Sequence, residues 1–446
     1  MARLFGTDGV RALANGDVLT PELALSVARS AAHELLARRA SSGRPRAVIG
    51  RDTRPSGPML EAAAAAGFAS AGVDVELLGV VPTPVVARAC SRGGADLGLM
   101  VSASHNAMPD NGLKLFGSGG WKLPDEVEIA VEAGLGGVRE RPTGLGVGRI
   151  TAADPRIVEA YVAGLLAALP ARPEGLTVVV DCAQGAASGL APEVYRAAGA
   201  KVVAIAADGD GDHINDGCGA THLELLQAAV LEHGADLGLA HDGDADRCLA
   251  VDASGSVVDG DQLMALLAVA MHERGQLPHS TVVATVMSNL GFVRAMESRG
   301  ITVLQTAVGD RYVLEAMRAG GHALGGEQSG HTVMLEHATT GDGLLTGICV
   351  LGRMAETGRS LADLAGVMSR LPQVLTNVRA ERTRAEDPDV LEAVAAEQAL
   401  LAGSGRVLLR PSGTEALVRV MVEAESAEQA GEVAARLASV VGAQER

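Results

Sequence analysis

The sequence contains one pattern three times, and this internal repeat limits the folds available to the chain more than any other feature. Each copy runs from an apolar strand through a polar loop and a helix to a glycine and a second apolar strand; the copies span Ala47–Leu78, Thr177–Ala206 and Thr281–Gln305. The predicted helices end at Gly72, Gly199 and Gly300, because glycine readily takes the left-handed conformation that closes a helix. The repeat therefore predicts three similar α/β domains.

The repeat also extends downstream of these copies. The hexapeptide Gly-Ala-Asp-Leu-Gly-Leu occurs at Gly94–Leu99 and again at Gly234–Leu239, each time where a helix gives way to a strand. A polar loop follows in both places, and the third unit has Gly325–His331 at the corresponding position. Because ligands of α/β sheets bind beyond the carboxyl ends of the strands, we expect the three loops to face one central cleft.

After about Leu371 the pattern changes to a smaller α+β domain. Strands are predicted at Gln373–Arg379, Arg406–Leu409 and Leu417–Val422, with a helix at Ser426–Val441. The expected division of the chain is into residues 1–155, 156–255, 256–370 and 371–446, the first three being α/β domains and the last the α+β domain.

Composition excludes several classes of function. The formal net charge of −17 and an aromatic content of 2% argue against a nucleic-acid partner, which needs cationic surface and stacking side chains. None of the three lysines completes a G-x-x-x-x-G-K-[ST] phosphate loop, so a P-loop nucleotide enzyme is excluded. The five cysteines include no C-x-x-C pair, so neither a zinc site nor a disulfide framework is indicated. No segment has the length and apolarity of a membrane anchor or a signal peptide, and we expect a cytoplasmic protein.

The first polar loop offers a nucleophile. It follows the apolar run Leu97–Val101 and contains Ser102 and Ser104, of which Ser104 lies further outside the strand. His105 is not expected to deprotonate Ser104, since neighbouring residues of an extended chain point to opposite faces. Capture of a phosphate by a rigid loop fits better, and the alternative is a polar βα turn without a ligand.

The second polar loop predicts a site for a hard cation. Asp242, Asp244 and Asp246 alternate along the chain and, if extended, point to one side, where their oxygens can converge on Mg²⁺. The loop is not an EF-hand, because its sixth position is Arg247 instead of glycine. Asp208–Asp212 has the same spacing, and spacing alone does not separate the two stretches. The register of the repeat and Arg247, which suits a neighbouring phosphate, favour the second loop; a solvated turn is expected at 208–212.

The two remaining loops suit a phosphorylated sugar. Glu327–His331 supplies donors and acceptors for vicinal hydroxyls, and an ordinary turn is the alternative. Arg410–Glu415, with the sequence RPSGTE, combines a guanidinium, two hydroxyls and a glycine that lets backbone N–H groups approach an oxyanion. Arg419 follows on the next predicted strand. A surface turn is the alternative there as well.

Taken together, the motifs resemble those of the α-D-phosphohexomutases over essentially the whole chain. The matching stretches, in order, are Phe5–Ala12, Gly50–Gly57, Ser102–Lys114, Asp242–Arg247, Val308–Val313, Gly326–His331, Thr339–Leu345 and Arg410–Glu415. Ala107 stands where the family often has proline, and Gln184 where asparagine is commoner. Neither residue is a proposed ligand, so the resemblance stands.

The resemblance implies roles for individual residues. Ser104 would carry the phosphoryl group and, with Asp242, Asp244 and Asp246, bind Mg²⁺; Glu327 and Ser329 would hold sugar hydroxyls; and Arg410, Ser412, Gly413, Thr414 and Arg419 would hold the phosphate that is not reacting. A general base must also accept the proton of the sugar hydroxyl, and both Lys114 and His331 remain candidates. Arg11 and Arg247 are expected to steady the phosphate at the reacting end.

The residues of the motifs are most similar to those of the bacterial members acting on glucosamine phosphates. The implied reaction interconverts glucosamine 6-phosphate and glucosamine 1-phosphate through glucosamine 1,6-bisphosphate, as a step towards UDP-N-acetylglucosamine and cell-wall precursors. Mannose or glucose phosphates are the alternative substrates, and a Mg²⁺-dependent phosphatase or a non-catalytic sugar-phosphate sensor are alternative functions. The expected partner is a small sugar phosphate, with neither nucleic acid nor membrane; the sequence leaves open whether the chain is a monomer or a homodimer.

Overall fold

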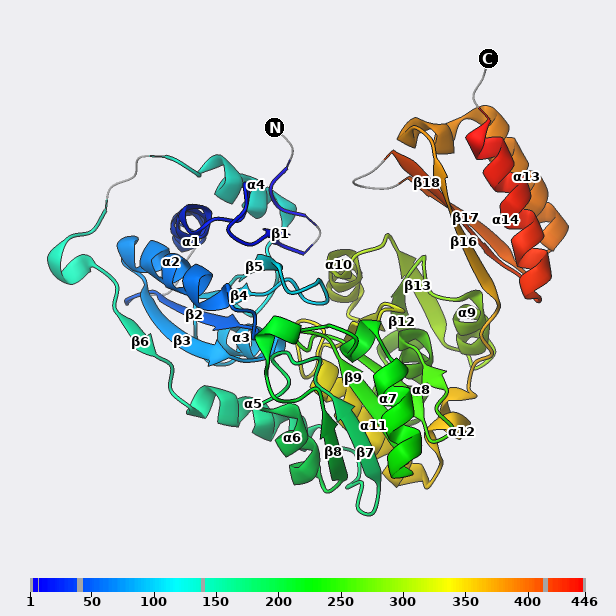
Figure 1. The fold of residues 1–446 in the computed structure, drawn as a ribbon, viewed down its shortest axis with the longest axis horizontal. Coiled ribbons are helices and arrows are strands. Elements are labelled where there is room, and N and C mark those ends of the chain that lie inside the picture. Colours follow the sequence, from blue (N-terminus) through cyan, green and yellow to red (C-terminus); the bar gives the residue numbers. More distant parts are fainter. Residues whose placement is uncertain (1–2, 7, 38–42, 138–140, 412–415, 444–446) are drawn as a thin grey trace. The chain divides into compact units, whose positions relative to one another are not determined.

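The computed structural model describes residues 3–6, 8–37, 43–137, 141–411 and 416–443. These residues divide into two compact units, one formed by Met1–Met287 with Ile301–Gly366 and the other by Ser288–Gly300 with Val367–Arg446. The first unit contains three sheets and the second contains one (Figure 1). All five cysteines are free and buried. Within the described residues, no helix combines the length and apolarity needed to cross a bilayer.

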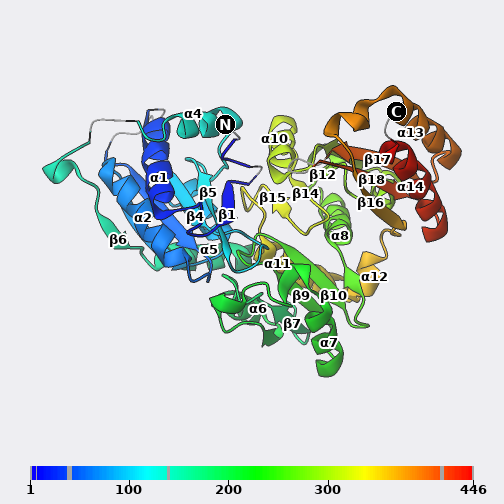
Figure 2. The ribbon, with the colours of Figure 1, turned by 45° about the horizontal axis from the view of Figure 1, so that its top comes forward.

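The first sheet has the strand order β1-β5-β4-β2-β3-β6. Its strands are β1 (Val10–Leu13), β2 (Arg46–Arg51), β3 (Asp74–Val80), β4 (Leu97–Val101), β5 (Asp110–Phe116) and β6 (Ile150–Ala152). The accompanying helices are α1 (Pro21–Leu36), α2 (Gly57–Ser70), α3 (Thr83–Ser91) and α4 (Asp125–Ala133). Helices α1 and α2 lie side by side against the sheet (Figures 1 and 2), and the core between them is built mainly from alanine, valine and leucine.

The second sheet has the order β11-β10-β9-β7-β8. Its strands are β7 (Thr177–Asp181), β8 (Lys201–Ile205), β9 (Leu237–His241), β10 (Cys248–Asp252) and β11 (Val257–Val258), with helices α5 (Arg156–Ala167), α6 (Ala191–Ala198) and α7 (Glu224–His233). The third sheet, β13-β12-β14-β15, is formed by β12 (Thr281–Thr285), β13 (Thr302–Thr306), β14 (Leu324–Gly326) and β15 (Thr332–Met334). Its helices are α8 (Gly260–Glu273), α10 (Asp310–Gly320), α11 (Gly343–Thr357) and α12 (Leu361–Ala365).

The internal repeat is reproduced in the strand pairing of the three sheets. The first strand of each repeat copy (β2, β7 or β12) lies between two parallel neighbours, which are the second and third strands of the same copy. The third strand (β4, β9 or β14) then pairs with an antiparallel fourth strand (β5, β10 or β15). The three polar loops therefore connect the third strand to the fourth. The strand-to-helix turn given as the alternative after Val101 is not found, because the chain reverses into β5.

The second unit is an α+β domain. Its sheet has the order β16-β18-β17, with β16 (Gln373–Arg379), β17 (Arg406–Pro411) and β18 (Leu417–Glu423). Helices α13 (Pro388–Leu401) and α14 (Ala427–Gly442) lie side by side against this sheet (Figures 1 and 2). Helix α9 (Leu290–Glu297) belongs to the same unit: the Leu290 N–H and the Asn289 side chain both donate to the buried carboxylate of Glu423.

Candidate active site

Ser104 lies at the end of β4 in a left-handed backbone conformation, with φ of 55°. Its side chain is fully buried, and its Oγ donates a hydrogen bond of 2.6 Å to Oδ2 of Asp242. The Ser104 N–H donates to Oγ of Ser102 at 2.9 Å, and Ser102 in turn donates to Asp52 at 2.6 Å. The two candidate serines thus differ in their surroundings. The Ser104 hydroxyl contacts Asp242 in the aspartate loop, whereas the Ser102 hydroxyl accepts the backbone N–H of Ser104.

The loop that carries Ser104 is held by one arginine. Arg54 is fully buried and forms an ion pair of 2.9 Å with Asp52. Its two terminal nitrogens donate to the carbonyl oxygens of residues Ser104, Asn106, Ala107 and Asp110, at 2.5 to 3.1 Å. Together with the bond from Nε to Asp52, all five guanidinium N–H groups are used. This arrangement stabilises the left-handed conformation at Ser104, which costs free energy in a residue other than glycine.

The expected separation of His105 from Ser104 was wrong. Nδ1 of His105 lies 3.2 Å from Oγ of Ser104, because the left-handed backbone at Ser104 replaces the extended chain on which opposite faces would be expected. Burial, and then the nearby Arg247 and Arg11, lower the pKa of His105 to about 4. The imidazole is therefore neutral at pH 7. The hydroxyl proton of Ser104 is directed to Asp242, so this contact does not form a Ser-His-Asp triad.

Asp242, Asp244 and Asp246 converge as expected, although by a different route. One carboxylate oxygen from each lies within 4.8 Å of the others. The loop is a tight turn in which Ala245 has φ of 56° and donates its N–H to the Asp242 carbonyl oxygen. The three carboxylates are therefore brought together by a turn, and the extended-chain alternation predicted from the sequence was wrong.

The three carboxylates fit a divalent cation. All three are buried, and Oδ1 of Asp244 and Oδ1 of Asp246 are buried without a hydrogen-bond partner among the described residues. Burial, and then the neighbouring Asp246 and Asp244, raise the pKa of Asp242 to about 8. Buried carboxylates that repel one another and have oxygens to spare are the donor set that a hard cation needs.

Lys114 lies on β5 beside these carboxylates. Its Nζ lies 2.7 Å from Oδ2 of Asp244, 3.3 Å from Oδ2 of Asp246 and 3.0 Å from Oδ2 of Asp8. Burial alone would lower the pKa of Lys114, but the three carboxylates outweigh it and raise the pKa well above its ordinary value. The side chain is therefore held as an ammonium ion in this structure.

His331, at the start of β15, faces the same cluster. Its Nδ1 lies 3.7 Å from Asp246 and its Nε2 lies 3.6 Å from Asp310. Burial lowers the pKa of His331, and the two carboxylates raise it further than burial lowers it. The Gly341 N–H donates to Nε2 at 3.1 Å, which favours an unprotonated Nε2. The two influences oppose each other, so both candidates for the general base stay open.

Two arginines border Ser104 and the aspartates. Arg11, on β1, pairs with Asp8 and donates to the Ala103 carbonyl oxygen at 3.3 Å. Nε of Arg247 lies 3.9 Å from Oδ2 of Asp242, a distance too long for a hydrogen bond. Nε of each arginine is buried without a hydrogen-bond partner in the described structure. Each therefore has a donor to offer to a phosphoryl group.

The third loop places Glu327 and Ser329 near this cluster. Oε1 of Glu327 accepts the Gly309 N–H at 3.1 Å, and its charge raises the pKa of Arg247, although by less than Asp242 and Asp246 do. Oγ of Ser329 is buried and has no partner within the described residues. Both side chains retain hydrogen-bonding capacity for a polar ligand.

The predicted distal phosphate residues belong to the second unit. Arg410 on β17 and Arg419 on β18 are directly opposite each other in the antiparallel pair. Directly opposed residues project to the same face of a sheet. Nε of Arg419 is buried without a hydrogen-bond partner in the part of this unit that the structure describes. Ser412, Gly413 and Thr414 lie outside the described residues.

The other Asp-x-Asp-x-Asp stretch, Asp208–Asp212, is a solvated turn, as expected. Asp210 is exposed; it accepts the Asp212 N–H at 3.2 Å and contacts His213 at 2.9 Å. In the described parts of the chain, the cluster at residues 242–246 is the one group of carboxylates that converges on a common point.

Several residues at the site were not predicted. Asp8 contacts Lys114 and Lys122, and Lys122 also contacts Asp310. Thr83, the first residue of α3, donates its Oγ1 to Oδ2 of Asp244 at 2.6 Å. Asp8 and Asp310 occur in two of the motifs that carried the resemblance, which was the only signal for them; Thr83 and Lys122 lie in none.

Models of four protein domains match this chain in order. They are described as phosphoglucomutase/phosphomannomutase alpha/beta/alpha domains I, II and III, matching residues 2–141, 159–255 and 259–371, and the C-terminal domain, matching residues 375–440. The chain belongs to the phosphoglucomutase/phosphomannomutase family. The resemblance to phosphohexomutases inferred from the motifs is thereby confirmed, as is the fold of three α/β domains followed by a smaller one.

Within this family, the chain has close full-length relatives. A phosphoglucosamine mutase of Parafrankia sp. (strain EAN1pec) is 60% identical, with 99% of each chain covered. A phosphoglucosamine mutase of Streptomyces griseus is 61% identical, also with 99% of each chain covered. Among solved structures, a phosphoglucomutase/phosphomannomutase family protein from Burkholderia thailandensis is 26% identical, with a TM-score of 0.81 and 98% of each chain covered.

Proposed function

We propose that the protein interconverts glucosamine 6-phosphate and glucosamine 1-phosphate. The observation that carries the proposal is the hydrogen bond between Ser104 and Asp242, within a buried cluster of three carboxylates that fits a divalent cation. Chains about 60% identical over 99% of their length, named as phosphoglucosamine mutases, support glucosamine phosphate over the phosphates of glucose or mannose. Mg²⁺ is the cation we propose, because the donor set is entirely oxygen.

In the proposed reaction, Ser104 carries a phosphoryl group before substrate binds. The bond between phosphorus and Oγ breaks as the 1- or 6-hydroxyl of the sugar forms a new bond to phosphorus, and a general base takes the hydroxyl proton. The product is glucosamine 1,6-bisphosphate, which turns over and returns its other phosphoryl group to Ser104. A bound cation would offset negative charge on the transferring group.

Each protein group has a defined part in this scheme. Arg11 and Arg247 hold the phosphoryl group at the Ser104 end through donors that are otherwise unused. Lys114 and His331 are the two candidates for the general base. Glu327 and Ser329 hold sugar hydroxyls, and Gln328 and His331 are the other polar residues of their loop. We also propose that the enzyme is cytoplasmic and that its four domains are divided near residues 155, 255 and 370. A homodimer is compatible with this proposal.

The opposed Arg410 and Arg419 support a mutase over a phosphatase. A phosphatase acting through Ser104 needs one phosphate site, whereas the mutase must hold a second phosphate while the first reacts. Two arginines on one face of β17 and β18 are suited to that second phosphate. With Ser412, Gly413 and Thr414, they form the proposed distal phosphate site.

The test is direct. The purified protein is incubated with glucosamine 6-phosphate, Mg²⁺ and catalytic bisphosphate, and formation of the 1-phosphate is followed by ³¹P NMR. Intact-mass analysis should find one phosphate on the wild type and none on Ser104→Ala, which should also lose turnover. Ser102→Ala keeps the nucleophile and should still be phosphorylated. A higher kcat/KM for glucose or mannose phosphate than for glucosamine phosphate would reject the substrate while preserving the mechanism.

A further inference from the structure

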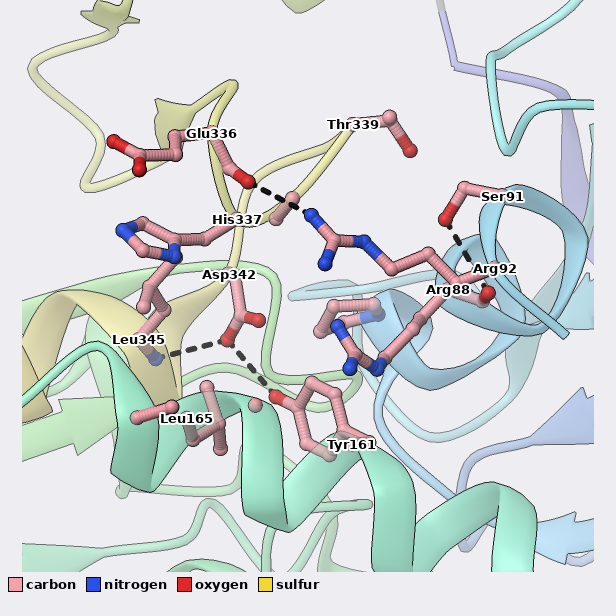
Figure 3. Close-up of a pocket in the computed structure, with 14 residues that line it drawn as sticks. Arg88, Ser91, Arg92, Tyr161, Leu165, Glu336, His337, Thr339, Asp342 and Leu345 are labelled. Carbon is pink, nitrogen blue, oxygen red and sulfur yellow. Dashed lines mark hydrogen bonds between the residues drawn. The ribbon is translucent and has the colours of Figure 1, made fainter.

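A cavity lies in the first unit beside α3. Its volume is about 300 Å³, and its walls are the second half of α3, the middle of α5, the segment 336–339 and the start of α11. Figure 3 shows two arginines, Arg88 and Arg92, reaching from α3 into the space beside His337 and Tyr161. None of the residues lining this cavity belongs to the site around Ser104.

Two guanidinium groups, those of Arg88 and Arg92, lie at the cavity. Nη2 of Arg92 donates to the Glu336 carbonyl oxygen at 2.9 Å, but no hydrogen bond or ion pair holds the Arg88 guanidinium within the described structure. Burial, and then the charge of Arg92, lower the pKa of Arg88. Burial lowers the pKa of His337, and Arg92 and Arg88 lower it further, against the opposing charge of Glu336. A chain with a formal net charge of −17 thus places two guanidinium groups close together without a carboxylate that neutralises both.

Helix α5 is shaped to hold the Arg88 guanidinium at the cavity. Gly164 lies in the middle of this helix, and a Cβ atom there would lie 2.8 Å from Nη2 of Arg88 and 2.9 Å from its central carbon. The absence of a side chain at Gly164 therefore lets the guanidinium lie directly on the helix. Glycine in a helix interior costs about 1 kcal/mol relative to alanine, so the helix gives up stability at the position where Arg88 packs.

The acidic groups near the cavity offset the charge of the two arginines only in part. Asp342 is buried at its floor, where one oxygen accepts the Tyr161 hydroxyl and the Leu345 N–H, both at 2.9 Å. Burial raises the pKa of Asp342 to about 6, so the carboxylate is ionised at pH 7 and its charge acts on Arg88, although its two donors fix it in place as the cap of α11. Glu336 is exposed, and its carboxylate points away from the arginines in Figure 3.

We propose that this cavity binds the oxyanion group, phosphate or carboxylate, of a small metabolite, with the group held between Arg88 and Arg92. Two guanidinium groups supply paired N–H donors that match either oxyanion. Ser91 and Thr339 line the same space, but their hydroxyls already donate to the Arg88 and Gly120 carbonyl oxygens, at 3.2 and 2.7 Å, so the donors for the oxyanion come from the two guanidinium groups. The volume of about 300 Å³ accommodates a small metabolite. Binding relieves the repulsion between the two arginines.

The walls of this oxyanion site are continuous with the aspartate loop. Helix α3, which carries Arg88 and is followed directly by Arg92, begins at Thr83, and Thr83 donates to Asp244 through both its Oγ1 and its N–H. The segment that follows Thr339 reaches the same loop, because the Gly343 N–H donates to the Ala245 carbonyl oxygen at 3.0 Å. A bound oxyanion therefore contacts the two elements that position the proposed cation ligands.

The experiment uses the three tyrosines of the chain. Full-length protein is labelled with 3-fluorotyrosine, and the ¹⁹F signal of Tyr161, at the floor of the cavity, is assigned by its absence in Tyr161→Phe. Inorganic phosphate and succinate are the two probes, each titrated at constant ionic strength with sodium chloride as the reference. We expect a saturable shift of the Tyr161 signal with at least one probe, and the more effective probe identifies the oxyanion.

Two variants and one control decide whether the shift comes from this cavity. Arg88→Gln removes one of the two cations and should weaken the apparent affinity at least tenfold. Gly164→Ala keeps every charge but displaces the guanidinium, and should weaken affinity in the same direction. Arg196→Gln, a surface arginine on α6 paired with exposed Glu193, should leave it unchanged. No saturable shift with either probe, or an unchanged titration in Arg88→Gln, would overturn the proposal; neither readout depends on turnover of a sugar phosphate.

Discussion

Arg54→Lys isolates the geometry of the loop around Ser104 from its charge. The Arg54 guanidinium is fully buried and donates five hydrogen bonds, one to Asp52 and four to carbonyl oxygens of residues 104–110. A lysine keeps the positive charge beside Asp52, but its ammonium has three N–H groups and lacks the planar fork. At least two of the five bonds are therefore lost.

The magnitude follows from these contacts. A hydrogen bond from a charged donor contributes about 1.5–3 kcal/mol, so the loss of two costs about 3–6 kcal/mol. Asn215 also donates to the Ser104 and Asn106 carbonyl oxygens, at 2.9 and 3.1 Å. These two acceptors stay paired, and we expect the lower end of the range. Because a misplacement of about 1 Å can cost about 100-fold in rate, kcat should fall by about that factor while KM changes little.

The assay compares variants in the mutase reaction and in urea unfolding. Arg196→Lys is the matched control, since Arg196 makes an exposed contact of 2.8 Å with Glu193, and surface pairs of this kind contribute about 0–1 kcal/mol. It should match the wild type in both measurements. If Arg54→Lys unfolds at lower urea but retains the wild-type kcat, Arg54 contributes to folding alone, and the argument that it positions Ser104 is refuted.

Three further outcomes are expected. Asp244→Asn should weaken Mn²⁺ binding, measured by electron paramagnetic resonance, more than tenfold, whereas Asp210→Asn should leave it unchanged; the reverse would move the cation site to the other loop. Burial raises the pKa of Asp181 to about 6, so its contribution to stability is complete well below its unfolded pKa of about 4 and is lost as the pH rises through 6. Relative to Asp181→Asn, the free energy of unfolding should fall by about 2 kcal/mol between pH 4 and 7, and a pH-independent difference would contradict this. Arg419→Gln should raise KM for the sugar phosphate about tenfold or more, whereas Arg436→Gln, which removes the ion pair between an exposed arginine and the largely buried Glu397, should not. Equal KM values in the two variants would make the arginine pair a structural feature only.

The repeat in the sequence predicted the fold well because it records strand order directly. Each copy contains the two parallel strands and the helix between them, and the hexapeptide at 94–99 and 234–239 marks the third strand. The antiparallel fourth strand was not predicted, because a strand-to-helix turn and a strand-to-strand turn contain the same polar residues. Helix α13 (Pro388–Leu401) was also not assigned, although its proline at the start of a run of helix-favouring residues gives a sequence signal.

The contacts at the site depend on backbone conformations that the sequence does not display. Ser104 and Ala245 both have positive φ, which is uncommon for these residue types, so the sequence suggested extended chain in both places. This assumption placed His105 on the wrong side of Ser104 and gave the wrong reason for the convergence of the aspartates. Arg54 shows why: the side chain that stabilises the unusual conformation lies fifty positions away in the sequence, where only tertiary structure reveals its partner.

The two Asp-x-Asp-x-Asp stretches show what position in a sheet adds to spacing. Asp208–Asp212 follows β8, the edge strand of the second sheet, and its side chains are satisfied by their own turn and by water-accessible neighbours such as His213. Asp242–Asp246 follows β9, which lies between β7 and β10, and its loop is covered by Thr83 from α3 and Lys114 from β5. Identical spacing therefore leads to opposite solvation. Carboxylates at the edge lose little by remaining hydrated. The buried set gains more from a cation, because Lys114 pairs, among these three carboxylates, with those of Asp244 and Asp246 only and the repulsion that raises the pKa of Asp242 remains.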